Sequence, residues 1–367
     1  MTEAQLLTPD ERRDALVGKL FTGGVEALDL LSVYLGDKLG LYRALASEST
    51  LTPGELASVA GIQERYAREW LEQQAASGIL DLAEDSDDPS ARRFRLPAGH
   101  DEALLDCDSL SYIAPLAHLL VGIVRPIDLV MRAYREGGGV PFEAYGPDVY
   151  EGQAAFTRPL YARLLGSEWL PAAAAIHERL IADPPARVAD LACGGGLSSI
   201  AIARAYPKVR VDGIDLDAPS IELARRHLTD SPDVAGRVEF HLADAASPGL
   251  AGRYDLVTIF EALHDMSYPV KALAAARGLL ADGGSVLVGD ERTADRFEVP
   301  AGEFERLLYG ASILHCLPVG MVGEGAAGTG TVMRVETVRR YAEEAGFSGF
   351  EVLPIEHEFY RFYRLTP

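Results

Sequence analysis

The sequence predicts an α/β fold, a Rossmann-like sheet of seven strands that follows a mostly helical N-terminal domain. Two observations lead to this prediction. In the C-terminal half, short apolar segments that often end in an acidic residue alternate with helical segments, as in a parallel sheet covered by helices. In the N-terminal half, apolar residues at helical spacing precede two short segments that alternate like strands.

The first strand of the sheet is predicted at residues 186–191, with Asp190 near its end, and a helix follows over Leu197–Tyr206. The turn between them begins with Ala192 and Cys193. It continues with three consecutive glycines, Gly194, Gly195 and Gly196. A glycine turn lets a ligand approach the backbone closely, because no Cβ intrudes and positive φ is allowed.

Acidic residues also end the next two strands. Asp215 ends a strand predicted over Val209–Asp215, and Asp244 with Ala245 ends the strand that begins at Val238. A carboxylate at the end of the second strand can accept both hydroxyls of a ribose, so this edge predicts a nucleoside-binding site. The turn lacks the order G-x-G-x-x-G of dinucleotide sites, and no Gly-Lys-Ser/Thr follows it to hold a triphosphate.

Together with a buried fourth strand over Tyr254–Phe260, residues 184–292 resemble the class I S-adenosylmethionine-dependent methyltransferases. The resemblance implies the seven-stranded methyltransferase sheet and S-adenosyl-L-methionine as cofactor. It places the glycine turn under the methionine part, Asp215 at the ribose and Asp244 at the adenine. The cofactor-binding residues that it implies are Asp190, Ala192, Gly194, Gly195, Gly196, Asp215, Leu216, Asp244, Ala245 and Phe260. The family usually has glycine in place of Ala192.

Composition and charge narrow the possible partners. The 367 residues carry 55 acidic and 34 basic side chains, and the net charge of −21 repels nucleic-acid phosphates and anionic lipids. No segment reaches the ~20 apolar residues of a membrane span, and the first residues lack the order of a signal peptide. The three cysteines, Cys107, Cys193 and Cys316, lack the spacing of disulfides or a structural zinc site. We therefore expect a cytoplasmic protein that binds neither nucleic acid nor membrane.

Residues 1–100 are predicted to form a winged-helix domain. Apolar residues over Gly24–Ala46 fall mostly at helical spacing, and a capping box at Thr52 begins a second helix. A third helix follows, and Ile79–Leu82 and Arg93–Leu96 are predicted as the two strands of the wing.

A winged helix alone suggests DNA binding, but its charge argues against this. Residues 40–100 hold six arginines, no lysine and ten acidic residues, a net charge of 6 − 10 = −4. Cations are needed for the phosphate contacts that supply non-specific affinity, and the third helix has only Arg65 and Arg68. The pattern also resembles the dimerisation domain of small-molecule O-methyltransferases of the plant caffeate and bacterial polyketide type. We expect a homodimer; the alternative is a DNA-binding regulator that holds S-adenosylmethionine without catalysis.

Residues 101–183 are predicted as a helical connector that leads to a catalytic domain over 184–367. In the resembling O-methyltransferases this region covers the acceptor. Tyr161 and Trp169 are therefore candidates to contact the substrate, although core packing or a dimer interface is the commoner role for such aromatic residues.

The pair His264-Asp265 follows the fourth strand, beyond the strand ends where such sheets bind ligands. In the resembling O-methyltransferases a His-Asp pair here supplies the catalytic base, and an imidazole titrates near working pH. We predict that His264 takes the proton of a phenolic or enolic acceptor, with Asp265 and Asp290 as its catalytic partners. Glu291 is an alternative to Asp290 as the orienting acid. In the alternative without chemistry, His264 caps the following helix.

His315 lies in the apolar segment Ser312–Met321, which faces the acceptor in this fold. We expect His315 and Glu261 to contact the substrate, a small aromatic metabolite methylated on oxygen, nitrogen or carbon. As an alternative, His264, Asp265 and His315 would bind a divalent or ferric ion that chelates the substrate. That set is similar to a metal-dependent branch of the superfamily, which methylates the carbon beside the carbonyl of a keto acid.

Overall fold

The computed structural model describes residues 7–250 and 253–367. The chain divides into two compact units, one ending at Val121 and the other beginning at Gly122. The predicted connector of 101–183 is thus divided between the units and forms no unit of its own. Within the described ranges, no helix is both long enough and apolar enough to cross a membrane.

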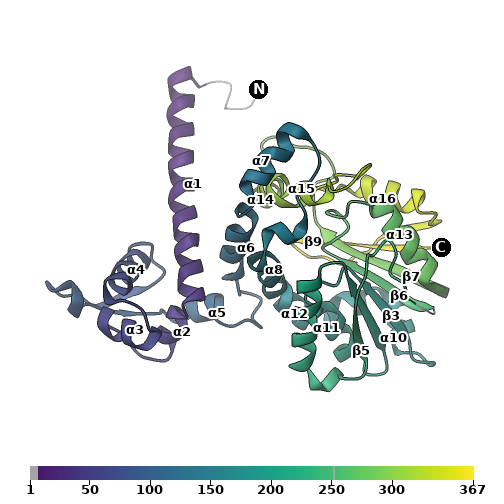
Figure 1. Cartoon of the computed structure of the whole chain (residues 1–367), viewed down its shortest axis with the longest axis horizontal. Helices are drawn as coiled ribbons and strands as arrows, with labels where there is room; N and C mark the ends of the chain where they lie inside the picture. Colours follow the sequence, from purple (N-terminus) through teal and green to yellow (C-terminus); the bar gives the residue numbers. More distant parts are fainter. Residues whose placement is uncertain (1–6, 251–252) are drawn as a thin grey trace. The chain divides into compact units, whose positions relative to one another are not determined.

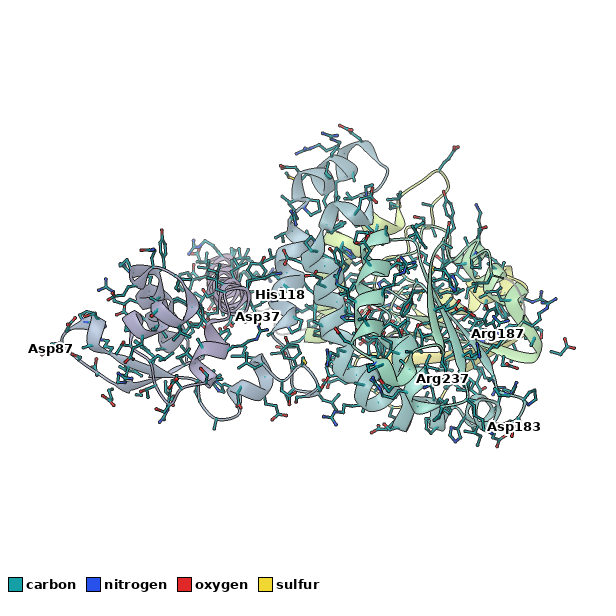
Figure 2. The ribbon with its side chains drawn as sticks, turned by 60° about the horizontal axis from the view of Figure 1, so that its bottom comes forward. Asp37, Asp87, His118, Asp183, Arg187 and Arg237 are labelled. Atoms are coloured by element: carbon teal, nitrogen blue, oxygen red, sulfur yellow. The ribbon has the colours of Figure 1, made fainter. Side chains whose placement is uncertain are left out.

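The first unit begins with a helix longer than predicted. Helix α1 spans Pro9–Lys38 and starts at a capping box, in which Thr8 and Glu11 each accept a hydrogen bond from the backbone N–H of the other. Gly40, with φ of 69°, separates it from α2, Leu41–Ala46. His118, further along this unit, pairs with Asp37 at 2.8 Å between Nε2 and Oδ2 (Figure 2).

The winged-helix prediction is confirmed in this unit (Figure 1). The elements after α2 are α3 (Pro53–Ala60), α4 (Glu64–Ala76), β1 (Asp81–Glu84), β2 (Arg93–Arg95) and α5 (His100–Leu104). Strands β1 and β2 pair antiparallel as the wing. The unit has its own core, in which the rings of Tyr42 and Trp70 meet edge to face with centroids 5.1 Å apart.

The second unit is built on the predicted seven-stranded sheet. Its strands are β3 (Arg187–Leu191), β4 (Arg210–Asp215), β5 (Val238–Leu242), β6 (Tyr254–Phe260), β7 (Leu280–Glu291), β8 (Gly349–Val352) and β9 (Tyr360–Thr366). The order across the sheet is β5-β4-β3-β6-β7-β9-β8. The strands from β3 to β7 are parallel, whereas β9 is antiparallel to both β7 and β8.

Helices cover both faces of this sheet, which explains why its strands are apolar on successive residues. Val188 of β3 packs into one core and Ala189 packs into the other. The first core includes side chains from α10 (Ala174–Ile181), α11 (Leu197–Ala205) and α12 (Ala218–Thr229). The second includes α13 (Pro269–Leu279) and α16 (Val335–Glu344). The remaining α-helices are α6 (Pro115–Val124), α7 (Ile127–Glu136), α8 (Pro147–Leu160), α9 (Leu170–Ala172), α14 (Glu303–Ala311) and α15 (Leu317–Gly320).

Two π-helical segments interrupt the helices of this unit. The first, η4, spans Tyr161–Trp169 between α8 and α9. The second, η6, spans Ser312–Cys316 and joins α14 to α15, so the predicted helix of 301–309 continues through His315. Such segments inside helices often occur at functional sites.

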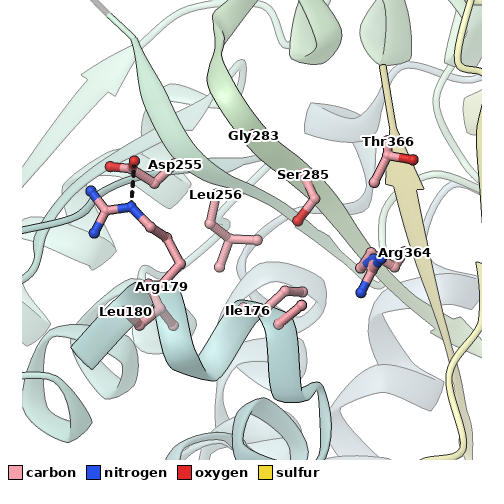
Figure 3. A pocket seen from close by; sticks show the side chains of 10 residues that line it. Ile176, Arg179, Leu180, Asp255, Leu256, Gly283, Ser285, Arg364 and Thr366 are labelled. Atoms are coloured by element: carbon pink, nitrogen blue, oxygen red, sulfur yellow. Dashed lines mark hydrogen bonds and ion pairs between the residues drawn. The ribbon is translucent and has the colours of Figure 1, made fainter. Parts of the chain in front are cut away.

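The carboxyl ends of β3, β4, β5, β6 and β7 meet at one edge of the sheet, where a sheet of this topology binds ligands. A small pocket lies at the opposite edge, beside the start of β6 and the end of β9 (Figure 3). There Arg179 Nε donates to Asp255 Oδ1 at 2.8 Å. Its position at the amino ends of the parallel strands separates it from the candidate site.

Candidate active site

The turn after β3 has the backbone geometry expected of a ligand-binding loop. Ala192, Gly194 and Gly196 have φ of 56°, 50° and 73°. A Cβ at Gly196 would lie 2.3 Å from the ring of Phe240, so glycine there is required for packing against β5. A Cβ at Gly195 would lie 3.0 Å from the Ala154 side chain, whereas one at Gly194 would meet nothing within 4 Å. The turn is therefore open at Gly194.

Ala192 departs from the family's usual glycine at a residue where the backbone is left-handed, a conformation that glycine favours. A non-glycine residue there costs about 1–2 kcal/mol, whereas glycine loses about 0.5–1 kcal/mol of additional backbone entropy on folding. We expect Ala192→Gly to raise the free energy of unfolding by about 0.5–1 kcal/mol in urea denaturation. Ala189→Gly, in the middle of β3, is the control and should lower it. Destabilisation by both variants would contradict the strain argument.

Asp215, at the end of β4, is hydrogen-bonded to the glycine turn. Its Oδ2 accepts a hydrogen bond from the Gly194 N–H, and its Oδ1 accepts one from the Asp217 N–H, both at 2.8 Å. Burial raises the pKa of this carboxyl to about 6. Each carboxylate oxygen can accept a second hydrogen bond. The group is therefore fixed in position and still able to bind the two hydroxyls of a ribose.

Asp190 supports the glycine turn through hydrogen bonds to neighbouring elements. Its Oδ2 accepts from Ser198 and Ser199 of α11 at 2.6 and 2.7 Å, and its Oδ1 accepts from Thr258 of β6 at 2.7 Å. The side chain is 1% exposed. These bonds tie β3 to α11 and β6, so Asp190 positions the glycine turn through neighbouring residues.

The predicted adenine side lies after β4 and β5. Leu216 is 70% exposed at the end of β4 and offers an apolar surface. Asp244 is exposed and accepts a hydrogen bond from the Ala246 N–H at 2.8 Å, while Ala245 is half-buried. The Ala243 N–H donates to the Asp215 carbonyl at 2.9 Å, which joins this loop to the predicted ribose site.

Beyond β6 the chain turns sharply at Glu261, whose φ is 50°. Gln153 donates a hydrogen bond to Glu261 Oε2, and burial raises the pKa of this carboxyl to about 8. Phe260 is buried directly before it and packs against Tyr161, with ring centroids 5.8 Å apart. Tyr161 thus lies next to the end of β6.

Trp169 lies in the core, beside strand β9. It is 2% exposed and packs against Tyr360 and Phe362 of β9, with ring centroids 5.6 and 4.9 Å away. This placement corrects the predicted substrate contact, because the ring is enclosed in the core by apolar neighbours. The pattern of aromatic residues in 101–183 could not separate this role from a place near the substrate.

His264 is the centre of the candidate site. It is 3% exposed, and its Nδ1 lies 2.8 Å from Asp290 Oδ1 and 2.9 Å from Glu291 Oε2. Both acids end strand β7. Burial disfavours the charged ring, but the charges of Glu291 and Asp290 outweigh burial and raise the pKa of His264 above its ordinary value. The sequence named both acids as alternatives, and the structure brings both to the histidine.

The two acids have different protonation. Burial favours the neutral form of both, yet the charge of His264 holds the pKa of Asp290 below its ordinary value. Burial dominates at Glu291 and raises its pKa. Asp290 is therefore the ionised partner of the imidazole. Burial raises the pKa of the neighbouring Asp265 to about 6, against the charge of His264.

His315 is neutral and enclosed by aromatic rings. Burial and the charge of His264 lower its pKa to about 3. Its ring meets Tyr145 and Phe142 edge to face, with centroids 4.4 and 5.8 Å away. Its Nδ1 lies 3.4 Å from the Sγ of Cys316. The sequence assigned no role to Cys316, and it offered Tyr145 only as one of several connector aromatic residues that could line the acceptor pocket. Their contacts with His315 arise only when η6 forms and packs against other helices.

The predicted metal ligands His264, Asp265 and His315 are not brought together. Among the described residues, potential donors gather within metal-binding range at His264, Asp290 and Glu291, and at Asp212, Glu239 and His241. Nδ1 of His264 instead faces Asp290 and Glu291 at the end of β7.

Comparison with known proteins finds a matching family within each of the two units. Residues 188–284 match a family of methyltransferase domains, and residues 27–105 match a family described as the Rv2258c-like winged HTH domain. The ubiquinone biosynthesis O-methyltransferase of Aromatoleum aromaticum is 31% identical over 176 residues, which are 47% of this chain and 68% of that protein. Other curated relatives of this kind are matched over a smaller share of their length, for example 42% and 44%.

Solved structures share the fold over nearly the whole chain. The mitomycin 7-O-methyltransferase has a TM-score of 0.70 at 20% identity, with 97% of this chain and 98% of that chain covered. An O-methyltransferase from neocarzinostatin biosynthesis, bound to S-adenosyl-L-homocysteine and 1,4-dihydroxy-2-naphthoic acid, has a TM-score of 0.61 at 17% identity, with 92% and 95% covered. At these identities the likeness concerns the fold.

Proposed function

Because the chain belongs to the S-adenosylmethionine-dependent methyltransferases, we propose that it transfers a methyl group from S-adenosyl-L-methionine to a hydroxyl oxygen of a small, aromatic acceptor. The observation that carries this proposal is the buried pair of His264 and Asp290, which lies beyond the same strand ends as Asp215 and the glycine turn. A proton acceptor thus stands beside a nucleoside-binding edge.

The residues present fit this cofactor. The turn at Gly194 is open, and Asp215 is held with free acceptor capacity toward a ribose. Several buried carboxyl groups lie near His264, namely Glu261, Asp265, Asp290 and Glu291. Asp265 and Asp290 are the ionised members of this group at neutral pH, and their negative charge favours a cationic ligand. When bound, S-adenosylmethionine supplies an electrophilic methyl group on a positively charged sulfur.

His264 is the proposed general base. The acceptor oxygen forms its bond to the methyl carbon as the carbon–sulfur bond breaks, and the hydroxyl proton passes to the imidazole. Nδ1 donates to the Asp290 carboxylate, so Nε2 is the nitrogen left to accept that proton. Asp290 orients the ring and stabilises the imidazolium that forms. Tyr161, Glu261 and His315 are the proposed substrate contacts.

The function is tested by incubating the protein with methyl-labelled S-adenosylmethionine and a panel of phenols, enols and aliphatic alcohols. We expect label in an aryl or enol ether, with one S-adenosylhomocysteine released for each methyl transferred. Label on carbon or nitrogen would contradict O-methylation. Binding of the cofactor with no transfer to any acceptor would favour the non-catalytic alternative.

We also propose that the chain forms a homodimer through α1. Large apolar side chains are exposed along this helix, at Leu16, Val17, Leu20, Phe21, Val25, Leu28, Leu31 and Leu35. Exposed apolar surfaces of this extent usually mark an interface. The winged helix is not proposed to read DNA, because Arg65, Arg92 and Arg93 are each paired with an acid of the same unit.

Replacement of Leu20 and Phe21 by aspartate is expected to convert a dimer to a monomer, because two charges would be buried in the apolar interface. Light scattering after size-exclusion chromatography measures the mass of the particle. Tyr66→Asp is the control, since Tyr66 is 75% exposed on α4 and lies outside the patch. A wild-type protein that is monomeric at micromolar concentration would contradict the proposal.

A further inference from the structure

Two tyrosine hydroxyls bond to the backbone of the segment that carries His315. Tyr134 of α7 donates to the Ile313 carbonyl at 3.2 Å, and Tyr145 donates to the Leu314 carbonyl at 2.9 Å. Carbonyl groups inside a helix usually accept hydrogen bonds from backbone N–H groups of the next turn. Side-chain donors on two neighbouring carbonyls therefore indicate that a backbone donor is missing at this point of the helix.

Pro318 explains the missing donor. It stands four residues after Leu314 and five after Ile313, so a residue here would bond to the first carbonyl in an α-helix and to the second in a π-helix. Proline has no N–H and can make neither bond. The α-helical donor for Ile313, the Leu317 N–H, bonds instead to the Ser312 carbonyl. The two hydroxyls thus supply hydrogen bonds that the backbone cannot make, and a buried carbonyl without any donor is costly.

A backbone contact joins the same stretch of the connector to Pro318. The Val140 N–H donates to the Pro318 carbonyl at 2.9 Å. A Cβ on Gly139 would lie 2.4 Å from that oxygen, so glycine is needed for the backbone to pass so closely. Residues 134–145 therefore hold the segment 313–318 through both hydroxyls and through this backbone bond.

Of the two hydroxyls, that of Tyr145 is the better shielded from water. Its side chain is fully buried, whereas Tyr134 is 63% exposed, so water can take the place of the Tyr134 hydroxyl. Burial raises the pKa of Tyr145, so its hydroxyl stays protonated and able to donate. The ring of Tyr145 also packs edge to face against His315, with centroids 4.4 Å apart. One side chain therefore contacts both the backbone before His315 and its imidazole ring.

We propose that Tyr145 is a positioning residue of the acceptor site, which supplies the hydrogen bond that Pro318 cannot make and so holds the π-helical segment that places His315 at the acceptor. This inference rests on the proposed methyl transfer, in which His315 contacts the acceptor. The hydroxyl bonds to a main-chain carbonyl and contacts neither His264 nor the glycine turn. Its loss should therefore raise KM for the acceptor and leave kcat close to that of the wild type.

Tyr145→Phe tests this role, because it removes the hydroxyl and keeps the ring against His315. The probe is the phenol that the wild type methylates fastest in the panel described under the proposed function, and the dissociation constant of S-adenosylhomocysteine should not change. We expect kcat/KM for that phenol to fall by about tenfold through KM, because a buried carbonyl loses its donor. Tyr134→Phe should cost less than about threefold, since water replaces its hydroxyl. An unchanged KM, or a loss that lies in kcat, would overturn the inference.

Two double variants identify the groups through which the hydroxyl acts. Pro318→Ala restores a backbone N–H for the carbonyls, so loss of the Tyr145 hydroxyl should cost much less in that variant than in the wild type. It should also cost little in His315→Ala, which lacks the side chain that is positioned. Effects that simply multiply in either pair would overturn the inference. Tyr206→Phe is the matched control and should multiply with both, since its buried hydroxyl lies 2.9 Å from Nδ1 of His177, at the end of α11.

Hydrogen exchange separates this inference from the proposed function, because it needs no acceptor. Exchange of backbone amides is followed by mass spectrometry on peptides that cover 312–321 of the intact protein. We expect exchange there to be about tenfold faster in Tyr145→Phe than in the wild type, and close to the wild type in Tyr206→Phe and when Pro318→Ala is added to Tyr145→Phe. Unchanged exchange in Tyr145→Phe would overturn the inference. A wild type that methylates no phenol would instead contradict the proposed function.

Discussion

Replacement of His264 by alanine is expected to lower kcat by about 10²–10⁴-fold, the range typical for loss of a general base. The affinity for S-adenosylmethionine should change little, because the turn at Gly194 and the carboxylate of Asp215 are held by other contacts. Initial rates and calorimetric titration with S-adenosylhomocysteine separate the two effects. A variant with nearly full kcat would show that His264 serves only the structure.

The pH dependence of the wild type gives a second readout of the same residue. A base must be unprotonated to accept a proton, and the charges of Glu291 and Asp290 raise the pKa of His264. The rate should therefore rise with pH and reach its plateau above the ordinary range for histidine. Asp290→Asn removes one of these charges, lowers the pKa of the ring and should move the rising limb toward acid. An unchanged limb in Asp290→Asn would contradict the assignment of His264 as the titrating base.

Replacement of Asp215 by alanine is expected to weaken S-adenosylmethionine binding by about 10²–10³-fold. The carboxylate would supply two charge-assisted hydrogen bonds to the ribose, each worth about 1.5–3 kcal/mol, and part of this loss is offset by water. The variant also leaves the Gly194 N–H without its acceptor. Asp282→Ala is the control, since this side chain is exposed near the start of β7, at the opposite edge of the sheet from the candidate site. A similar small loss in both variants would contradict the ribose assignment.

Cofactor binding should also depend on pH through Asp215. Burial raises its pKa to about 6, so the carboxylate is ionised above this value and protonated below it. Only the ionised form can accept two ribose hydroxyls while it holds the Gly194 and Asp217 N–H groups. The affinity for S-adenosylhomocysteine should therefore fall as pH decreases through about 6 in the wild type. In Asp215→Ala this step should be absent.

The strand ends were predictable because their signals are local. A run of apolar residues marks a strand buried on both faces, and the acids Asp190 and Asp215 mark where those strands stop. The start of α1 was local as well, since Thr8 and Glu11 have capping-box spacing, but the prediction began only at Gly24. The part of α1 before Gly24 exposes apolar side chains that contribute nothing to the core of a monomer.

The inner arrangement of the site could not be predicted, because it depends on which way side chains turn after the helices pack. The spacing of His264, Asp265 and His315 is compatible with a metal, yet in the described structure their donor atoms do not gather within metal-binding range. The partnership of Cys316 with His315 arises from a π-helical segment, which has no clear signature in the pattern of apolar residues. Trp169 likewise has no local signal that distinguishes it from the other aromatic residues of the connector, because its burial depends on packing against β9.

The proposed proton-transfer residues and the proposed acceptor-binding residues of this protein lie on different parts of the chain. Asp290 and Glu291 sit at the end of a twelve-residue strand flanked by β6 and β9, whereas His315 and Cys316 belong to the helical segment from α14 to α15. The proton-transfer apparatus is therefore anchored in the scaffold, and the proposed recognition of the acceptor resides in a separate stretch of about 18 residues. Grafting 303–320 between relatives should transplant acceptor preference while the acid–imidazole pair stays intact.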